Sequence, residues 1–279
     1  MKFKYDISIV YRVYPGISKQ PLIYKTDKYK LSKTCLKSFR SSLGDLKAKV
    51  WVLMDGCPDE YEDLFLEILD NVDIEIIRLS GESNVSTFLK QIEILINQEE
   101  SEYVYFSEDD YFYLPSSLQI GVNFLKNNHE VDFVTLYDNS DYYQSRLHFY
   151  NSKIKICNLR HWRNNSCTTL SFLTTKRVLN ETRSVFESFA KDNLDASLWM
   201  SLTKMNLFQF SSFIRFLRNQ DRDFVRILKA WLFCWKQILF GKKYNLWSPI
   251  PSLATHLEQE NISPIIDWKQ EVDKNNPKQ

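Results

Sequence analysis

Residues 103–115 read YVYFSEDDYFYLP, an apolar aromatic run that ends abruptly at three consecutive carboxylates, Glu108, Asp109 and Asp110. The run 103–106 predicts a short buried strand, and ligand sites in open α/β sheets lie just outside the carboxyl ends of such strands. Adjacent carboxylates repel one another unless water, a proton or a cation relieves the repulsion. The stretch therefore predicts a site for a hard divalent cation, Mg2+ or Mn2+, with a solvated acidic turn as the alternative.

Predicted strands and helices alternate from the start of the chain to residue 137. The strands are residues 7–13, 50–54, 74–79, 103–106 and 133–137. The helices are residues 31–42, 60–69, 85–96 and 117–126. This alternation predicts an α/β fold in which a mostly parallel central sheet is covered by helices on both faces.

The strand, the EDDY sequence at 108–111 and the aromatic residue and proline that follow resemble the metal-binding DXD segment of GT-A glycosyltransferases. The resemblance covers most of the chain and is greatest to family 2 enzymes of the bacterial polysaccharide or O-antigen type. It implies a Rossmann-like GT-A fold and a divalent metal, Mn2+ or Mg2+, that bridges the diphosphate of a nucleotide-sugar donor. It also implies that Glu108 and Asp110 are metal ligands and that Asp109 lies at the donor. Glu108 departs from a strict DXD pattern, which leaves open which two side chains hold the metal.

The segment PSLATH, residues 251–256, resembles the closing stretch of a group of bacterial glycosyltransferases. Several GT-A enzymes supply a late histidine as an additional metal ligand. The resemblance therefore implies that His256 is a ligand, and the alternative is an ordinary polar surface histidine.

Donor-binding candidates come from several parts of the chain. Asp55 ends a predicted strand, where GT-A enzymes commonly place an acidic residue near the nucleotide, and a turn-capping role is the alternative. The segment HWRNNSCTTLSF, 161–172, combines small polar side chains with Trp162, which suits sugar recognition, and a Thr-rich antiparallel strand is the alternative. The donor-binding candidates are Arg12, Asp55, Asp109, Trp162 and Ser166.

Asp192 and Asp195 are three residues apart and are predicted to share one helix face. In inverting GT-A enzymes, an acidic residue that opens a helix after the acceptor-side strand acts as general base on the acceptor hydroxyl. The resemblance implies this role for Asp195, with Asp192 as the alternate. A helix N-terminus would keep such a carboxylate ionised, although the same physics favours an aspartate there without any chemistry.

Residues 208–244 carry eight Lys and Arg against two Asp, whereas the whole chain has a net charge of +1. Apolar residues recur there at helical spacing: Phe213, Phe216, Leu217, Val225, Leu228, Trp231, Leu232, Trp235 and Leu239. A basic helix with Trp and Phe on one face can lie in an anionic membrane surface, and a helical hairpin packed on the core is the alternative. The predicted domains are a GT-A core (1–207), a basic, aromatic-rich helical insertion (208–245) and a C-terminal segment that returns to the active site (246–279).

The composition disfavours several other classes of protein. The small net charge argues against nucleic-acid binding through a global basic field. The sequence contains neither G-x-G-x-x-G nor G-x-x-x-x-G-K-[ST], which disfavours dehydrogenases, P-loop enzymes and Gly-loop nucleotidyltransferases. Five scattered cysteines and the absence of a signal-like or membrane-spanning stretch predict a cytoplasmic protein, with a peripheral position on the inner face of the membrane as the alternative.

Together these features predict a metal-dependent glycosyltransferase that moves a sugar from a nucleotide-sugar to a hydroxyl of a glycan or a lipid-linked glycan, with inversion. The first alternative is a catalytically inactive glycan- or nucleotide-binding protein of the same fold. The next is a retaining glycosyltransferase, followed by a metal-dependent phosphotransferase or nucleotidyltransferase.

Overall fold

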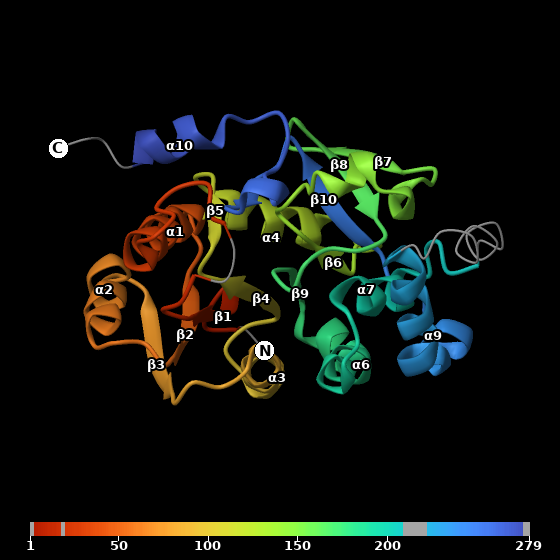
Figure 1. The fold of residues 1–279 in the computed structure, drawn as a ribbon, viewed down its shortest axis with the longest axis horizontal. Coiled ribbons are helices and arrows are strands. Elements are labelled where there is room, and N and C mark those ends of the chain that lie inside the picture. Colours follow the sequence, from red (N-terminus) through yellow and green to blue (C-terminus); the bar gives the residue numbers. More distant parts are fainter. Residues whose placement is uncertain (1–2, 18–19, 209–221, 276–279) are drawn as a thin grey trace.

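The computed structural model describes residues 3–17, 20–208 and 222–275. Its centre is a nine-stranded sheet with the order β3-β2-β1-β4-β9-β6-β10-β8-β7 (Figure 1). The strands of this sheet are β1 (Ile7–Val13), β2 (Ala48–Asp55), β3 (Asp73–Leu79), β4 (Tyr103–Glu108), β6 (Phe133–Val134), β7 (Ile154–Cys157), β8 (Arg160–Asn165), β9 (Leu173–Thr175) and β10 (Leu246–Ile250). A smaller sheet pairs β5 (Tyr111–Tyr113) with β11 (Ala254–His256). The helices are α1 (Lys28–Ser42), α2 (Glu60–Ile68), α3 (Asn84–Asn97), α4 (Ser117–Asn127), α5 (Asp141–Gln144), α6 (Lys176–Glu187), α7 (Asp195–Thr203), α9 (Arg222–Phe240) and α10 (Trp268–Asn275).

The first four strands form the regular, parallel half of the sheet. β1 pairs in parallel with β2 and β4, and β2 pairs in parallel with β3. The crossovers pass through α1, α2 and α3, which agrees with the predicted alternation. Polar side chains start two of these helices: the Asp27 carboxylate accepts from the Lys30 N–H before α1, and the Ser83 hydroxyl accepts from the Ser86 N–H before α3.

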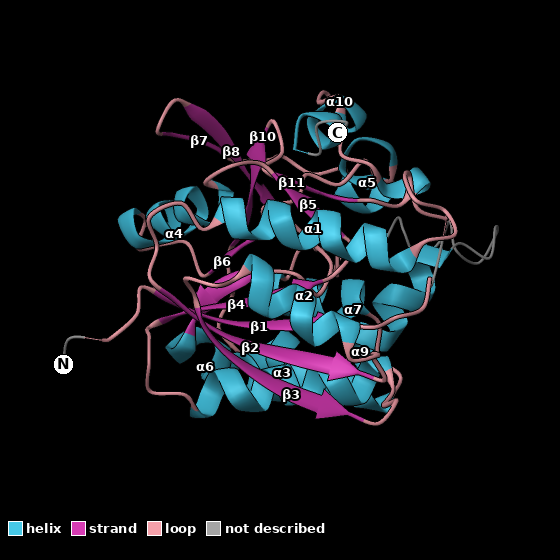
Figure 2. Ribbon diagram, turned by 90° about the vertical axis from the view of Figure 1, so that its left-hand side faces the viewer, coloured by secondary structure: helices cyan, strands magenta, loops and turns pink. Residues whose placement is uncertain are grey.

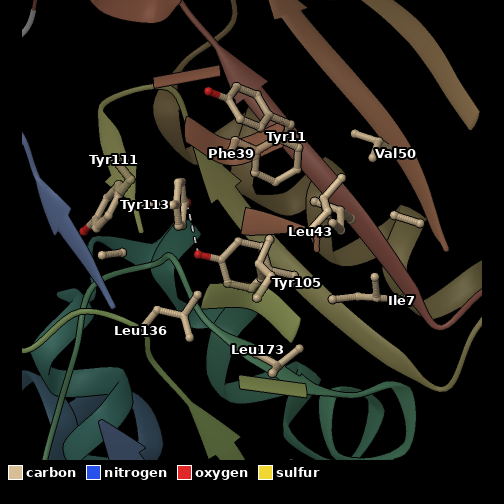
Figure 3. Packing of buried hydrophobic residues seen from close by; sticks show 14 of the residues in the cluster. Ile7, Tyr11, Phe39, Leu43, Val50, Tyr105, Tyr111, Tyr113, Leu136 and Leu173 are labelled. Atoms are coloured by element: carbon tan, nitrogen blue, oxygen red, sulfur yellow. Dashed lines mark hydrogen bonds between the residues drawn. The ribbon is translucent and has the colours of Figure 1, made fainter. Parts of the chain in front are cut away.

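Helices cover both faces of the sheet (Figure 2). On one face α1, α2 and α4 pack on Ile9 and Tyr11, and on the other α3, α6, α7 and α9 pack around Val10. Figure 3 shows the first face, where the ring centroids of Tyr11 and Phe39 are 5.0 Å apart. The residues of β1 thus alternate between two cores, and the predicted α/β class with helices on both faces is confirmed.

The second half of the sheet departs from simple alternation. β9 runs antiparallel between β4 and β6, and β8 runs antiparallel between β10 and β7. β6 is shorter than the predicted strand 133–137, because the chain bends away after Val134 and Tyr137 makes only an isolated bridge with Ala254. Buried polar contacts join these strands, such as the Asn165 amide that donates to the Ser248 hydroxyl at 2.6 Å.

The C-terminal part of the chain returns to earlier strands. β10 pairs with β6 and β8, and β11 pairs with β5. α9 packs against α7, while the predicted helical residues Phe213, Phe216 and Leu217 lie outside the described residues. The proposed domain limits stay a prediction. Within the part of the chain that the structure describes, no helix combines the length and the apolar character needed to cross a membrane.

Candidate functional site

The two most distinctive sequence segments, EDDY and PSLATH, lie side by side. β4 ends at Glu108, the chain turns through two aspartates, and β5 then pairs antiparallel with β11 so that Tyr111 faces His256 in the register. The Tyr111 and His256 rings stack with centroids 5.0 Å apart. The site therefore forms where the parallel half of the sheet ends and the C-terminal segment docks.

Asp110 and His256 form the centre of the site. The Asp110 Oδ2 lies 2.8 Å from the His256 Nε2, and the other ring nitrogen, Nδ1, lies 3.3 Å from the Glu258 Oε2. Burial lowers the pKa of His256, but the neighbouring carboxylates, Asp110 first, outweigh burial and raise it. Burial conversely raises the pKa of Asp110, but His256, Lys28 and Arg12 together hold it well below its usual range.

Glu108 points away from this pair. Its carboxylate accepts a hydrogen bond from the Arg12 guanidinium, and its second oxygen accepts one from the Ser171 hydroxyl at 2.8 Å. The same guanidinium donates to the backbone oxygen of Asn84 at 3.1 Å, at the start of α3. Arg12 thus fixes Glu108 against the sheet edge rather than leaving it free for a ligand.

Asp109 is buried beneath the site. Its Oδ2 accepts from the Lys28 ammonium at 2.8 Å, from the Ser32 hydroxyl at 3.1 Å and from the Tyr14 N–H at 3.4 Å. Burial raises the pKa of Asp109, and the charge of Lys28 opposes this rise without cancelling it. Lys28 and Ser32 lie one turn apart on α1, which holds Asp109 from one helix face.

Each carboxylate of the acidic segment consequently has a protein cation beside it. Arg12 neutralises Glu108, Lys28 neutralises Asp109 and His256 pairs with Asp110. Cationic side chains of the chain itself therefore relieve repulsion among the three carboxylates, and the bound divalent metal stays a prediction. A small pocket adjoins the site and is lined by Ile17, Pro21, Lys28, Leu31, Asp110, His256, Leu257 and Glu258.

The predicted metal ligands Glu108, Asp110 and His256 do not converge as a set of three. Among the described residues there is no group of three or more His, Cys, Asp or Glu side chains placed to hold a metal ion. Asp110 and His256 do converge, and the Asp110 Oδ1 is buried without a hydrogen-bond partner. A buried carboxylate oxygen that lacks a donor is costly, and one oxygen with one imidazole nitrogen suits Mn2+ or Mg2+ as a partial ligand set.

Three donor-binding candidates have structural partners that differ from the prediction. Asp55 is buried and its Oδ1 accepts from the backbone N–H groups of Gly81 and Glu82 at 2.8 and 2.6 Å, which matches the turn-capping alternative. Trp162 is 1% exposed and stacks on Phe124 in the core, so its ring offers no face to a sugar. Turn capping and core packing account for these two side chains, and a donor contact by either stays a prediction.

Ser166 is likewise fully buried. Its hydroxyl lies 3.0 Å from the His148 Nδ1, and its N–H donates to the Tyr150 hydroxyl at 2.9 Å. Its hydroxyl therefore faces an internal polar cluster, which corrects the expectation of a donor contact. Of the five donor-binding candidates, Arg12 and Asp109 lie at the acidic segment itself.

The two candidate bases occupy different settings. Asp195 is the first residue of α7, and its Oδ1 accepts from the Ala196 N–H at 2.6 Å. Asp192 is 91% exposed and pairs with the Lys229 ammonium at 2.8 Å. The predicted single helix therefore does not include both, since Asp192 ends a preceding 3-10 turn in the left-handed region with φ +67°.

Residue 169 connects α7 to the acidic segment. The Trp199 indole donates to the Thr169 carbonyl oxygen at 3.0 Å, and the Tyr111 hydroxyl donates to the Thr169 Oγ1 at 2.9 Å. The helix that carries Asp195 thus contacts the same loop as the residue after Asp110. This loop, 166–171, also supplies Ser171 to Glu108.

Sequence reasoning missed Lys28, Ser32, Ser171 and Glu258. Lys28 and Ser32 are spaced by four on α1, but the helix predicted from the sequence began at residue 31 and so did not include Lys28. Glu258 stands two residues after His256, a spacing that places both on one side of an extended chain. That signal was readable, whereas the contact of Ser171 with Glu108 depends on long-range folding.

No model of a known protein family matches the chain, and no curated protein matches its sequence. Solved structures with a similar arrangement of elements include S. aureus TarS residues 1–349, with a TM-score of 0.45 and 12% identity over 87% of this chain and 60% of that one. Glucosyl-3-phosphoglycerate synthase from Mycobacterium tuberculosis, solved with Mn2+ and UDP, has a TM-score of 0.42 and 11% identity over 72% of this chain and 66% of that one. The 4-diphosphocytidyl-2C-methyl-D-erythritol synthase from Anaerococcus prevotii has a TM-score of 0.40 and 11% identity over 72% and 83%.

The sheet described above is an α/β sheet whose parallel half, β3-β2-β1-β4, agrees with the fold class predicted from the sequence. The chain spans 60% of the length of the TarS fragment. At identities near 12% and TM-scores below 0.5, these likenesses do not assign a substrate or a reaction to the chain. The chemistry must be argued from its own side chains.

Proposed function

We propose that the protein is a metal-dependent glycosyltransferase, which transfers a sugar from a nucleotide-sugar to a hydroxyl of a glycan or a lipid-linked glycan with inversion. The observation that carries the proposal is the pairing of β5 with β11. It sets Asp110, with its unsatisfied buried Oδ1, beside His256 at the carboxyl end of β4, next to a pocket. Ligand sites in open α/β sheets lie at such edges.

Asp110 and His256 are the residues that would hold the metal. When bound, the ion would supply positive charge to the diphosphate that leaves during transfer. Glu258 would accept a hydrogen bond from the His256 Nδ1–H and so leave the lone pair of Nε2 for the site, as carboxylates commonly do behind a metal-binding histidine. Glu108 would act indirectly, because Arg12 and Ser171 already hold it.

Lys28 is a further candidate for donor binding. Lys28 lines the pocket and its ammonium pairs with Asp109, so a fixed cation would stand beside the space where a diphosphate would bind. The Lys28–Asp109 pair would therefore orient a positive charge before the donor arrives. Arg12 would support the same edge by fixing Glu108.

Asp195 is the better supported general base. It opens α7, where the helix N-terminus favours the ionised carboxylate, and α7 contacts the loop 166–171 beside the acidic segment. Asp192 is held by Lys229 on the surface, which makes it a weaker base. The base would take the proton of the acceptor hydroxyl as that oxygen attacks the anomeric carbon. NMR of the first-formed product distinguishes inversion from retention.

The experiment is a thermal-shift panel of nucleotide-sugars and free nucleotides, each with and without Mn2+. A ligand that binds only the folded state raises the apparent melting temperature. The proposal expects a metal-dependent rise with one nucleotide class, loss of that rise in Asp110→Ala, and retention of it in Asp70→Ala, a surface aspartate at the end of α2. No rise across the panel, or an equal rise in Asp110→Ala, would contradict the proposal.

The internal neutralisation of the acidic segment supports a second candidate. Because Arg12, Lys28 and His256 already pair with the three carboxylates, the site is electrostatically complete as it stands. A non-catalytic protein that binds a glycan or nucleotide is consistent with this. Nucleoside diphosphate release from a bound donor separates the two, since binding without any release over hours favours the non-catalytic reading.

The proposed acceptor also bears on location. A lipid-linked glycan would be met at the inner face of a membrane, so we place the protein in the cytoplasm as a peripheral protein at that surface. Fractionation of cells, with the protein tracked in the membrane pellet before and after a high-salt wash, tests this placement. Recovery only in the supernatant would remove it.

A further inference from the structure

α9 exposes a second apolar face that packs against nothing in the described structure. Val225, Leu228 and Leu232 precede a kink at Cys234 and Trp235 and Leu239 follow it; the five are spaced by three or four residues, and each is between 44% and 66% exposed. This set is the α9 stripe. A run of large apolar side chains along one helix face is unusual on a soluble protein surface and marks an interaction site.

The core contact of α9 is made by other residues. Ala230, Cys234 and Ile238 are buried, and the helix packs on α7 through this side. Trp231 is only partly exposed and packs near Met200 and Leu207. α9 therefore packs on the core, as one of the two sequence-based alternatives predicted, and its other face is left exposed, so that binding to an anionic membrane surface stays a prediction.

The α9 stripe lies in a strongly basic setting. Residues 222–243 contain six Lys and Arg against one Asp, Asp223, which is itself paired with Arg226 at 2.9 Å. Lys229 lies between stripe positions along the helix, and Lys236 directly follows Trp235. Lys236 and Lys243 are exposed and have no carboxylate partner among the described residues. Lys236 and Lys243 thus flank the stripe with positive charge that no described carboxylate pairs with, whereas Arg226, Lys229 and Lys242 are paired with Asp223, Asp192 and Asp132.

The charge decides which partner fits. A second copy of the chain would bring the same basic helix to the contact, and its single acidic side chain is already used by Arg226. An anionic lipid surface supplies both missing partners, since acyl chains receive the apolar side chains and phosphate headgroups receive Lys and Arg. Trp235 suits the boundary because an indole prefers the interface between apolar and polar regions.

We propose that the α9 stripe docks the protein on an anionic lipid surface, with the helix lying in the plane of that surface and its Lys residues on the headgroups. Figure 1 shows α9 at the end of the molecule opposite α2 and β3. Docking through this end would leave the nucleotide-binding half of the sheet in solution. The inference does not depend on glycosyl transfer, because lipid binding is measured without any donor.

The test is co-sedimentation of the full chain with vesicles of pure phosphatidylcholine or of phosphatidylcholine mixed with phosphatidylglycerol, at low and at high salt. The full chain is expected to bind the anionic vesicles at low salt, to release from them at high salt, and not to bind pure phosphatidylcholine. The double variant Leu232→Ser with Trp235→Ser should weaken vesicle binding by about tenfold or more. Lys236→Glu with Lys243→Glu should weaken it by a similar factor.

Matched controls lie elsewhere on the surface. Leu66→Ser removes an equally exposed leucine on α2, and Lys269→Glu reverses an exposed lysine on α10, so neither should change vesicle binding. All of these side chains are exposed, and circular dichroism confirms that each variant stays folded. Absence of binding to anionic vesicles, or equal loss in the controls, would overturn the proposal. A dimer in light scattering that dissociates in the stripe variant would also overturn it, in favour of a second copy.

Discussion

The two halves of the sheet contrast in how their sequence encodes them. In the half β3-β2-β1-β4, apolar runs are separated by helices, and β2 pairs with β1 and β3, the strands before and after it in the chain. In the half β9-β6-β10-β8-β7, strands are short and rich in polar residues, and β10 reaches back to β6 over more than a hundred residues. The first half is stabilised by apolar packing, which the alternation of apolar strands and helices in the sequence already predicts. The second half depends on buried polar contacts between residues that are distant in the chain.

The two halves also have different roles in the proposed chemistry. The variant Asp195→Asn tests this division of roles and should give the largest change in turnover. The donor and metal residues belong to the first half and to its β11 partner, while the base opens α7 in the second half. The variant should keep metal-dependent nucleotide binding and lose about 10^3- to 10^4-fold in turnover. Single-turnover assays and the thermal shift measure the two quantities separately.

Asp192→Asn is the matched control for the base. It should leave turnover within about twofold of the parent, because Asp192 is a surface partner of Lys229 and surface ion pairs contribute little. Normal turnover in Asp195→Asn, or loss in Asp192→Asn, would overturn the assignment of the base.

One substitution in each half should lower the stability by a similar amount but for a different physical reason. Phe39→Ala in the first core, and Arg163→Ala beside Asp138 in the second half, should each lower the free energy of unfolding by about 3–5 kcal/mol. The first leaves a cavity. The second leaves the Asp138 carboxylate, which is 1% exposed, without its cation.

A second change distinguishes these causes in urea unfolding. Adding Asp138→Asn to Arg163→Ala removes the buried charge and should restore part of the lost free energy, whereas no charge change rescues Phe39→Ala. Equal losses in the single and double variants would show that Arg163 acts through packing alone.

Acid should destabilise the second half through His148. Burial, with the charges of Arg163 and Arg226, lowers the pKa of His148 from 6.5 to about 4. Because the unfolded chain binds this proton first, stability is lost as the pH falls from about 6.5 to about 4, by about 3 kcal/mol in all. The measurement is the free energy of unfolding against pH for the parent and His148→Asn. Between pH 6.5 and 4 the free energy of unfolding should fall more steeply for the parent than for His148→Asn. Equal slopes for the two proteins would contradict the prediction, because they would mean that His148 is already charged in the folded state.

The smallest expected effect is on Mn2+ affinity and concerns Glu258, which lies beside His256 in the C-terminal segment. Glu258→Gln keeps the size of the side chain but weakens its hold on the His256 Nδ1, which should reduce Mn2+ affinity by about tenfold. Calorimetry with Mn2+ alone measures this change without any turnover. Glu260→Gln, an exposed neighbour, is the control and should bind Mn2+ like the parent.

Much of the first half could be predicted from sequence, and the reasons are physical. The apolar runs in β1 and β2 allowed only burial on both faces, and EDDY followed a run too apolar to be a loop. The sequence could not reveal that Arg12 and Lys28 would compensate the acidic segment, because both cations come from elements far from it in the chain.

The second half was harder to predict for a related reason. Trp162 and the hydroxyl side chains around it have the composition of a sugar site, yet composition does not say which side of a strand faces the core. β9 was missed because its three residues carry little pattern of their own and are ordered by β4 and β6 on either side. The position of β9 in the sheet depends on β4 and β6, which are distant from it in the sequence.

The pairing of β5 with β11 has a consequence during synthesis of the chain. Residues 103–113 emerge from the ribosome long before residues 254–256, so the early part can collapse around Tyr11 and Phe39 while Asp110 still lacks its histidine. Asp110 and His256 come together only after most of the chain has been translated. A nascent chain would therefore gain the pair in a single late step, after the parallel half of the sheet has been translated.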